Sequence, residues 1–170
     1  MVDKAIAGVI TLFLCGDVMT GRGIDQILRH PVSAVLYEPY VKDARTYVRL
    51  AEEKNGPISS AVCQTYIWGD ALSVLRRKNP DARIINLETS VTTSDEPWPG
   101  KAIHYRMHPA NVGCLSAAGV DCSVLANNHV LDWGREGLSE TLKVLESADI
   151  KTAGAGETPA AAAAPAVLPV

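Results

Sequence analysis

The sequence predicts an α/β fold in which a mainly parallel sheet is flanked by helices. Short, β-branched apolar runs alternate along the chain with amphipathic segments of helical period. The first three of these runs each end in a cluster of polar residues. Hydrophobic residues make up 47% of the 170 residues, which is enough to bury a core and excludes disorder as the main state.

Each expected element has its own local signal. The strands are the short apolar runs, and they span residues 9–15, 82–87, 122–126 and 150–153, with an extended piece at 103–107. The helices are amphipathic and bounded by Gly, Asn or Pro, and they span residues 21–28, 43–54, 66–78, 109–118 and a segment from Gly134 to Ser147. Residues 92–100 have the composition of a loop.

The last residues differ from the rest in composition. No charged residue follows Glu157, residues 159–165 are an alanine tract between prolines, and residues 166–170 resemble the first half of a strand. We therefore expect residues 1–170 to form the N-terminal part of one domain that is truncated after about 158–170. The alternative is a complete small domain with a frayed tail.

Charge and hydropathy limit the partners and the location. The 16 Lys and Arg residues against 19 Asp and Glu residues give a net charge of −3, so no nucleic-acid partner is expected. The longest apolar run, near residues 5–15, is too short to span a bilayer and lacks the features of a secretory signal. The expected location is therefore the cytoplasm.

The four cysteines form no C-x-x-C pair, which argues against a thiolate zinc site. Cys15, Cys114 and Cys122 lie in apolar stretches and are expected to be buried free thiols, although one disulfide stays open as an alternative.

Polar residues follow three of the predicted strands. Gly16-Asp17, Asn86–Glu88 and Asn127–His129 stand at strand ends, which meet at one edge of a parallel sheet. Carboxylate and amide oxygens suit hard divalent ions, and imidazole suits Mn, Fe and Zn. Asp132 can orient the imidazole of His129. Taken singly, each residue could instead cap a turn or pack in a loop, so the prediction depends on their combination.

Three segments carry a family resemblance. GDVMTGRG (Gly16–Gly23), NLETS (Asn86–Ser90) and ANNHVLDWGREGL (Ala126–Leu138) resemble the CapA-like capsule synthesis proteins, which are implicated in poly-γ-glutamate synthesis. That family is related to the calcineurin-like metallophosphoesterases. The resemblance extends from about Thr11 to Gly156. It implies a metallophosphoesterase-like sandwich, of which this chain would be the N-terminal half and would leave apolar residues exposed on one face of its sheet.

The resemblance also implies roles for individual residues. Asp17, Glu88 and Asn128 match metal ligands, for a divalent ion that would be Mn, Fe or Zn. His129 matches the histidine that donates a proton or stabilises charge on the substrate, with Asp132 as its orienting partner. Two departures stand out: Asp17-Val18-Met19 lacks a histidine ligand of the phosphoesterases, and no histidine follows His129.

Further candidates lie near these motifs. Arg22 and Arg106 are predicted to bind an anionic substrate, with a solvent-facing charge as the alternative. Lys101 is a weaker candidate for the same role, and Trp98 is either a lid over the site or a packing residue of its loop.

The function implied is metal-dependent hydrolysis or transfer on poly-γ-glutamate or a related anionic polymer. The alternatives are a non-catalytic assembly factor that binds the polymer or a membrane partner of capsule synthesis, and an inactive fragment.

Overall fold

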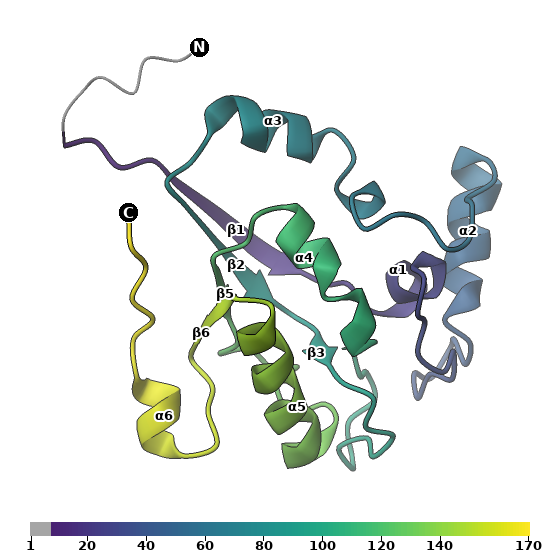
Figure 1. The fold of residues 1–170 in the computed structure, drawn as a ribbon. Helices are drawn as coiled ribbons and strands as arrows, with labels where there is room; N and C mark the ends of the chain where they lie inside the picture. Colours follow the sequence, from purple (N-terminus) through teal and green to yellow (C-terminus); the bar gives the residue numbers. More distant parts are fainter. Residues whose placement is uncertain (1–7) are drawn as a thin grey trace.

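The computed structural model describes residues 8–170 and confirms the α/β class with a mainly parallel sheet (Figure 1). A four-stranded parallel sheet has the order β1-β2-β5-β6. Its strands are β1 (Leu12–Val18), β2 (Ala82–Leu87), β5 (Cys122–Val124) and β6 (Lys151–Ala153). A second, two-stranded parallel sheet pairs β3 (Ser90–Val91) with β4 (Arg106–Met107).

The helices follow the expected order along the chain. They are α1 (Arg22–Ile27), α2 (Arg45–Asn55), α3 (Ala71–Lys78), α4 (Gly113–Ala117), α5 (Gly134–Ser147) and α6 (Pro159–Ala163), with 3₁₀ turns η1 (Tyr66–Trp68) and η2 (Pro109–Asn111). The prediction of a single helix over 66–78 is wrong. This segment is divided into η1 and α3 at Gly69, which has a φ of 50°. Glycine reaches this left-handed conformation without steric penalty, so the helix breaks there.

The C-terminal segment also differs from expectation. Residues 159–163 of the alanine tract form the short helix α6, because Thr158 caps it through Ala161 and Pro159 occupies its first turn. Residues 166–170 form no strand. The apolar run expected near 5–15 falls partly outside the structure, since residues 5–7 are not among those described.

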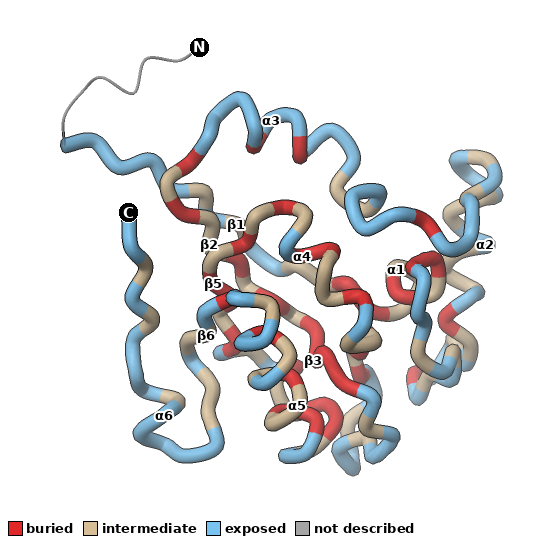
Figure 2. The backbone as a smooth tube through the Cα atoms, viewed as in Figure 1, coloured by how far each residue is buried: buried red, intermediate tan, exposed pale blue. Residues whose placement is uncertain are grey.

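The core lies on one face of the four-stranded sheet, and Figure 2 shows buried backbone concentrated along the middle of the molecule. Ile85 and Leu87 of β2 are 0% and 1% exposed, and they belong to one apolar cluster with Leu75, Leu115 and Leu145 from helices α3, α4 and α5. Burial of this cluster supplies the main favourable term for folding.

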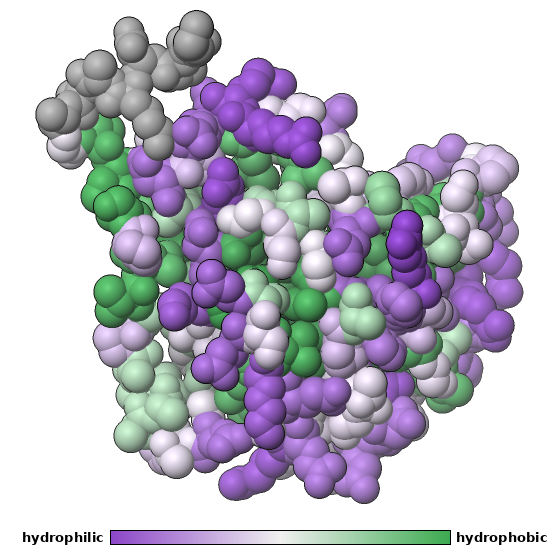
Figure 3. Space-filling model, in the orientation of Figure 1, coloured by the Kyte–Doolittle hydropathy of each residue, from purple (hydrophilic) through white to green (hydrophobic). Residues whose placement is uncertain are grey.

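The other face of β1 lacks a covering layer. Leu12 and Leu14 are 51% and 68% exposed, whereas the residues that alternate with them, Phe13 and Cys15, pack against the core. The exposure expected on one face of the sheet is therefore present at β1. Figure 3 shows further apolar residues gathered where the segment before β1 and the C-terminal segment lie.

Two simpler expectations can be compared with residues 8–170. No helix in this range is long and apolar enough to cross a membrane. All four cysteines are free, and Cys114 and Cys122 are buried as expected, while Cys15 is half-buried and Cys63 is exposed.

A buried carboxylate joins α1 to the segment that follows β4. Asp25 has no exposed surface, and it accepts hydrogen bonds from the backbone N–H groups of Val32 (2.7 Å) and His108 (2.9 Å) and from Nδ2 of Asn111 (3.0 Å). Burial raises the pKa of Asp25 even though these hydrogen bonds oppose the shift. The carboxylate therefore fixes three separate segments at one point.

Replacing Asp25 should destabilise the fold strongly. Asp25→Ala leaves three donors without their acceptor, and we expect the free energy of unfolding to fall by about 3 kcal/mol or more, measured by urea denaturation. Glu53→Ala, at an exposed carboxylate of α2, is the control and should change stability little. Equal stability of the two variants would contradict the structural role of Asp25.

Candidate functional site

The first three strands of the main sheet end at one edge, as their parallel order requires. Asp17 is the register partner of Asn86, and Asn86 is the partner of Val124. A register shift between Cys15 and Asp17 places the bulge at Gly16. The end of β1 is thus brought into line with the end of β2, and the polar residues of both strands share this edge.

Amide side chains link the three strand ends. Nδ2 of Asn86 donates to Oδ1 of Asp17 at 2.5 Å. Nδ2 of Asn127 donates to Oδ1 of Asn86 at 3.1 Å and to the carbonyl of Leu87 at 2.9 Å. Oδ1 of Asn127 then accepts from the backbone N–H of His129 at 2.9 Å. This chain of hydrogen bonds fixes the position from which His129 projects.

His129 is held between two carboxylates. Its Nδ1 lies 2.7 Å from Oδ2 of Asp132, and its Nε2 lies 3.6 Å from Oε1 of Glu88. The contact with Asp132 assigns the proton of the neutral ring to Nδ1. Nε2 makes no hydrogen bond within residues 8–170, and the His129 side chain is only 6% exposed. The nitrogen of His129 that is free of hydrogen bonds therefore faces Glu88.

Asp132 is the buried partner in this arrangement. Its carboxylate has no exposed surface and accepts from the backbone N–H of Tyr105 at 2.6 Å and from Nζ of Lys101. Lys101 also donates to the carbonyl of Asn128, and its Nζ lies 3.5 Å from Nδ1 of His129. The lysine compensates the buried negative charge, which would be costly alone.

The loop that carries Lys101 is fastened at several points. The Glu140 carboxylate of α5 accepts from the hydroxyl of Thr92 at 2.5 Å and from the backbone N–H of Thr93 at 2.8 Å. Burial alone would raise the pKa of Glu140, but these hydrogen bonds outweigh it and the pKa is lowered. Further along, the backbone N–H of Trp98 donates to the carbonyl of Asp132 at 2.8 Å.

Arg22 reaches the site from the start of α1. Its Nε lies 2.6 Å from Oε1 of the buried Glu38, whose other oxygen accepts from the Tyr47 hydroxyl at 2.5 Å. The guanidinium carbon lies 4.7 Å from the centre of the Tyr105 ring, and that ring stacks on His129 at 4.0 Å with an interplanar angle of 21°. Tyr105 therefore connects Arg22 to His129 by contact with both.

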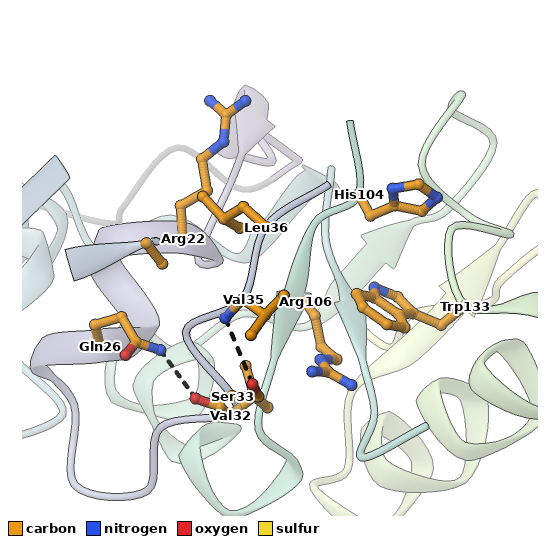
Figure 4. Close-up of a pocket in the computed structure, with 10 residues that line it drawn as sticks. Arg22, Gln26, Val32, Ser33, Val35, Leu36, His104, Arg106 and Trp133 are labelled. Atoms are coloured by element: carbon orange, nitrogen blue, oxygen red, sulfur yellow. Dashed lines mark hydrogen bonds between the residues drawn. The ribbon is translucent and has the colours of Figure 1, made fainter. Parts of the chain in front are cut away.

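Arg106 lines the same small pocket as Arg22 but has different partners. Its guanidinium is buried, donates to the carbonyl of Ser94 and to Oδ1 of Asp95 (2.7 Å), and lies 3.9 Å from the Trp133 ring centre. In Figure 4, the side chains of Arg22 and Arg106 point in opposite directions, and Arg106 lies against Trp133. The structure thus brings Arg22 to His129 and engages Arg106 in packing.

Comparison with known proteins identifies the family. The sequence profile described as "Bacterial capsule synthesis protein PGA_cap" matches residues 11–170. The chain belongs to this family. The match includes the strand ends that hold Asp17, Glu88 and His129, so the site lies within the part that defines the PGA_cap relationship.

Two relatives illustrate the similarity. The "Probable polyglutamine synthesis accessory protein" of Mycobacterium tuberculosis is 49% identical over 148 residues, which cover 87% of this chain and 39% of that protein. The "Capsule biosynthesis protein CapA" of Bacillus anthracis is 36% identical over 154 residues, which cover 87% of this chain and 29% of that protein. This PGA_cap chain therefore spans well under half the length of the relatives it matches.

The three predicted metal ligands of this PGA_cap chain form no hydrogen bond with one another among the residues described. Asp17 is bonded to Asn86, and the side chain of Asn128 is exposed and forms no hydrogen bond with the residues described. Over residues 8–170, no group of three His, Cys, Asp or Glu side chains is arranged to hold a metal ion. The 3.6 Å between Glu88 and His129 suits two ligands of one ion, each at about 2.0–2.2 Å from it. The fit is therefore partial.

Several residues of the site were not predicted. Asn127, rather than its neighbour Asn128, occupies the hydrogen-bonded position between the strands, and the NNH sequence alone does not distinguish the two. The sequence does not indicate the roles of Tyr105 and Glu38, and it indicates only weakly a role for Lys101. A buried Asp needs a nearby positive charge, and this requirement is a signal that points to a lysine such as Lys101 in a neighbouring loop.

The adjacent asparagines allow a matched test of this arrangement. Asn127→Ala removes the link between β2 and His129 and leaves polar groups unpaired, so we expect a loss of about 1–3 kcal/mol in the free energy of unfolding. Asn128→Ala removes a side chain without such contacts and should leave stability nearly unchanged. Chemical denaturation of both variants measures this, and the reverse order of stability would refute the assignment.

Proposed function

We propose that this chain contacts an anionic glutamate polymer, such as poly-γ-glutamate, during capsule synthesis, and does so at the carboxyl edge of its main sheet. Membership of the PGA_cap family and the names of its relatives support the capsule role. The observation that carries the location is the orientation of His129, whose Nε2 faces Glu88 and whose ring stacks on Tyr105 beside Arg22.

The charges of the site indicate what such a polymer needs in order to bind. The site has more negative than positive side chains. It contains two cations, Arg22 and Lys101, and four carboxylates, which are those of Asp17, Glu38, Glu88 and Asp132. Both cations are already paired, with Glu38 and Asp132 respectively. A polymer of carboxylates therefore requires additional positive charge here, and Glu88, with Asp17 and Asn128, is where a divalent ion, Mn, Fe or Zn, would supply it.

A bound ion would polarise the substrate oxygen and lower the pKa of a bound water. The protein residues have separate tasks in the proposed chemistry. Asp132 keeps the proton of His129 on Nδ1, so Nε2 can accept or deliver a proton during hydrolysis or transfer. Arg22 keeps its outer guanidinium nitrogens available for a carboxylate, since only Nε is engaged by Glu38. Asp17 and Asn128 remain proposed ligands, and Arg106 a proposed contact for more distant parts of the polymer.

A non-catalytic role in the same process is the second candidate. The observation that favours it is that, over residues 8–170, no group of three His, Cys, Asp or Glu side chains is arranged to hold a metal ion. The Mycobacterium tuberculosis relative is also named an accessory protein. In this version the polymer, or a membrane component of the capsule machinery, binds at the same edge without being cleaved.

Polymer binding should depend on both a divalent ion and Arg22. We expect a γ-linked glutamate oligomer to bind about tenfold or more tightly with Mn²⁺ than with a chelator, measured by isothermal titration calorimetry. Arg22→Gln should weaken binding about tenfold, because the carboxylate loses a charge-assisted partner. Arg77→Gln, which removes the same charge from the exposed side of α3, is the control. An affinity for the oligomer that is the same with Mn²⁺ and with chelator, and the same in Arg22→Gln, would rule out this site.

Metal binding can be tested apart from the polymer. Glu88→Gln should weaken the affinity for Mn²⁺ by about 10–100-fold or more. Titration of the 170-residue chain with Mn²⁺ measures this affinity. Asn128→Ala should also weaken it, and the loss could not arise from misfolding because this side chain has no hydrogen bond to lose within residues 8–170. Glu136→Gln, at an exposed carboxylate of α5, is the control. Unchanged affinity in both site variants would show that the ion does not bind there.

A further inference from the structure

A second cavity lies next to the candidate site, between the loop 92–100, the start of α5 and the segment leading into α6. Its volume is about 480 Å³, within the usual range for small-molecule sites. The wall includes Trp98, Leu131, Arg135, Leu138, Glu157 and Pro159. None of the residues assigned to the polymer site in the preceding section lines it, so it is a separate feature of the molecule.

The aromatic wall of this cavity is exposed but firmly held. Trp98 is 43% exposed, whereas Trp133 is 4% exposed. The backbone of Trp98 is fixed on both sides, since its N–H donates to the carbonyl of Asp132 at 2.8 Å and its carbonyl accepts from Nε2 of His104 at 3.0 Å. An indole carried on this fixed backbone, beside Leu131 and Leu138, offers an apolar surface for an aliphatic group.

Two opposite charges face the same cavity without pairing with each other. The guanidinium of Arg135 forms no hydrogen bond or ion pair with any residue in the range 8–170. Glu157 accepts from the hydroxyl of Ser139 at 2.7 Å through Oε1, which leaves Oε2 available. An anion alone would gain from Arg135 but would be repelled by Glu157, and an apolar ligand would leave both charges without partners.

We propose that this cavity binds the amino-terminal end group of a glutamate chain, a zwitterion with an aliphatic stem. Arg135 would pair with its carboxylate, Glu157 with its ammonium group, and the methylenes would lie on Trp98 and Leu138. The choice of glutamate rests on the proposed function, whereas the zwitterionic character rests on the two charges of the cavity. The position beside Asp132 places such an end group next to the site that contacts the rest of the polymer.

The experiment compares γ-linked diglutamate that has a free amine with its N-acetylated form. We expect the free form to bind the 170-residue chain at least about tenfold more tightly, by calorimetry, and to change the fluorescence of Trp98. Glu157→Gln should remove the preference for the free amine, and Arg135→Gln should weaken both forms. In Trp98→Phe, the fluorescence response should disappear. These side chains are exposed, so the variants should retain the parent circular dichroism spectrum.

The controls separate this proposal from the proposed function. Arg77→Gln should leave binding of both dipeptides unchanged. Equal affinity for the free and acetylated forms, or binding that is lost in Arg22→Gln but kept in Arg135→Gln, would overturn the end-group site while leaving the polymer site standing. A third outcome is that the dipeptide binds and requires Arg135 and Glu157, whereas longer oligomers show no dependence on Arg22. That outcome would support the cavity and refute the polymer site.

Discussion

The carboxylate of Asp132 is the group on which the organisation of the site depends. It has no exposed surface, so it requires hydrogen-bond donors and a nearby positive charge. Lys101, the Tyr105 N–H and the His129 ring meet this requirement. Together with the contacts of Glu140 to Thr92 and Thr93, this buried charge fixes the loop from residue 92 to 105, and it orients the ring of His129.

The same constraint joins the two features of functional interest. The backbone carbonyl of Asp132 holds Trp98, which forms a wall of the neighbouring cavity, while its side chain holds His129. The two features therefore share one buried residue, whose backbone carbonyl contacts the cavity wall and whose carboxylate contacts the histidine.

Regular elements could be predicted where local signals were strong. The helix from Gly134 to Ser147 and the strand over 82–87 follow from periodicity and apolar runs, and the shared edge of the strand ends follows from the parallel order. The break at Gly69 depends on a single backbone conformation, which periodicity does not report. The roles of Asn127 and Lys101 depend on contacts with residues about 30 to 40 positions away in the sequence, and such contacts become visible only after folding.

Arg22 lies in the left-handed region, with a φ of 50°, between two glycines. A side chain in this conformation stores on the order of 1–3 kcal/mol of backbone strain, which a glycine at the same position would release. A substitution that made the folded chain more robust would thus delete the guanidinium group beside Tyr105. Stability therefore favours a glycine at this position, whereas the ligand contact proposed for Arg22 requires the guanidinium.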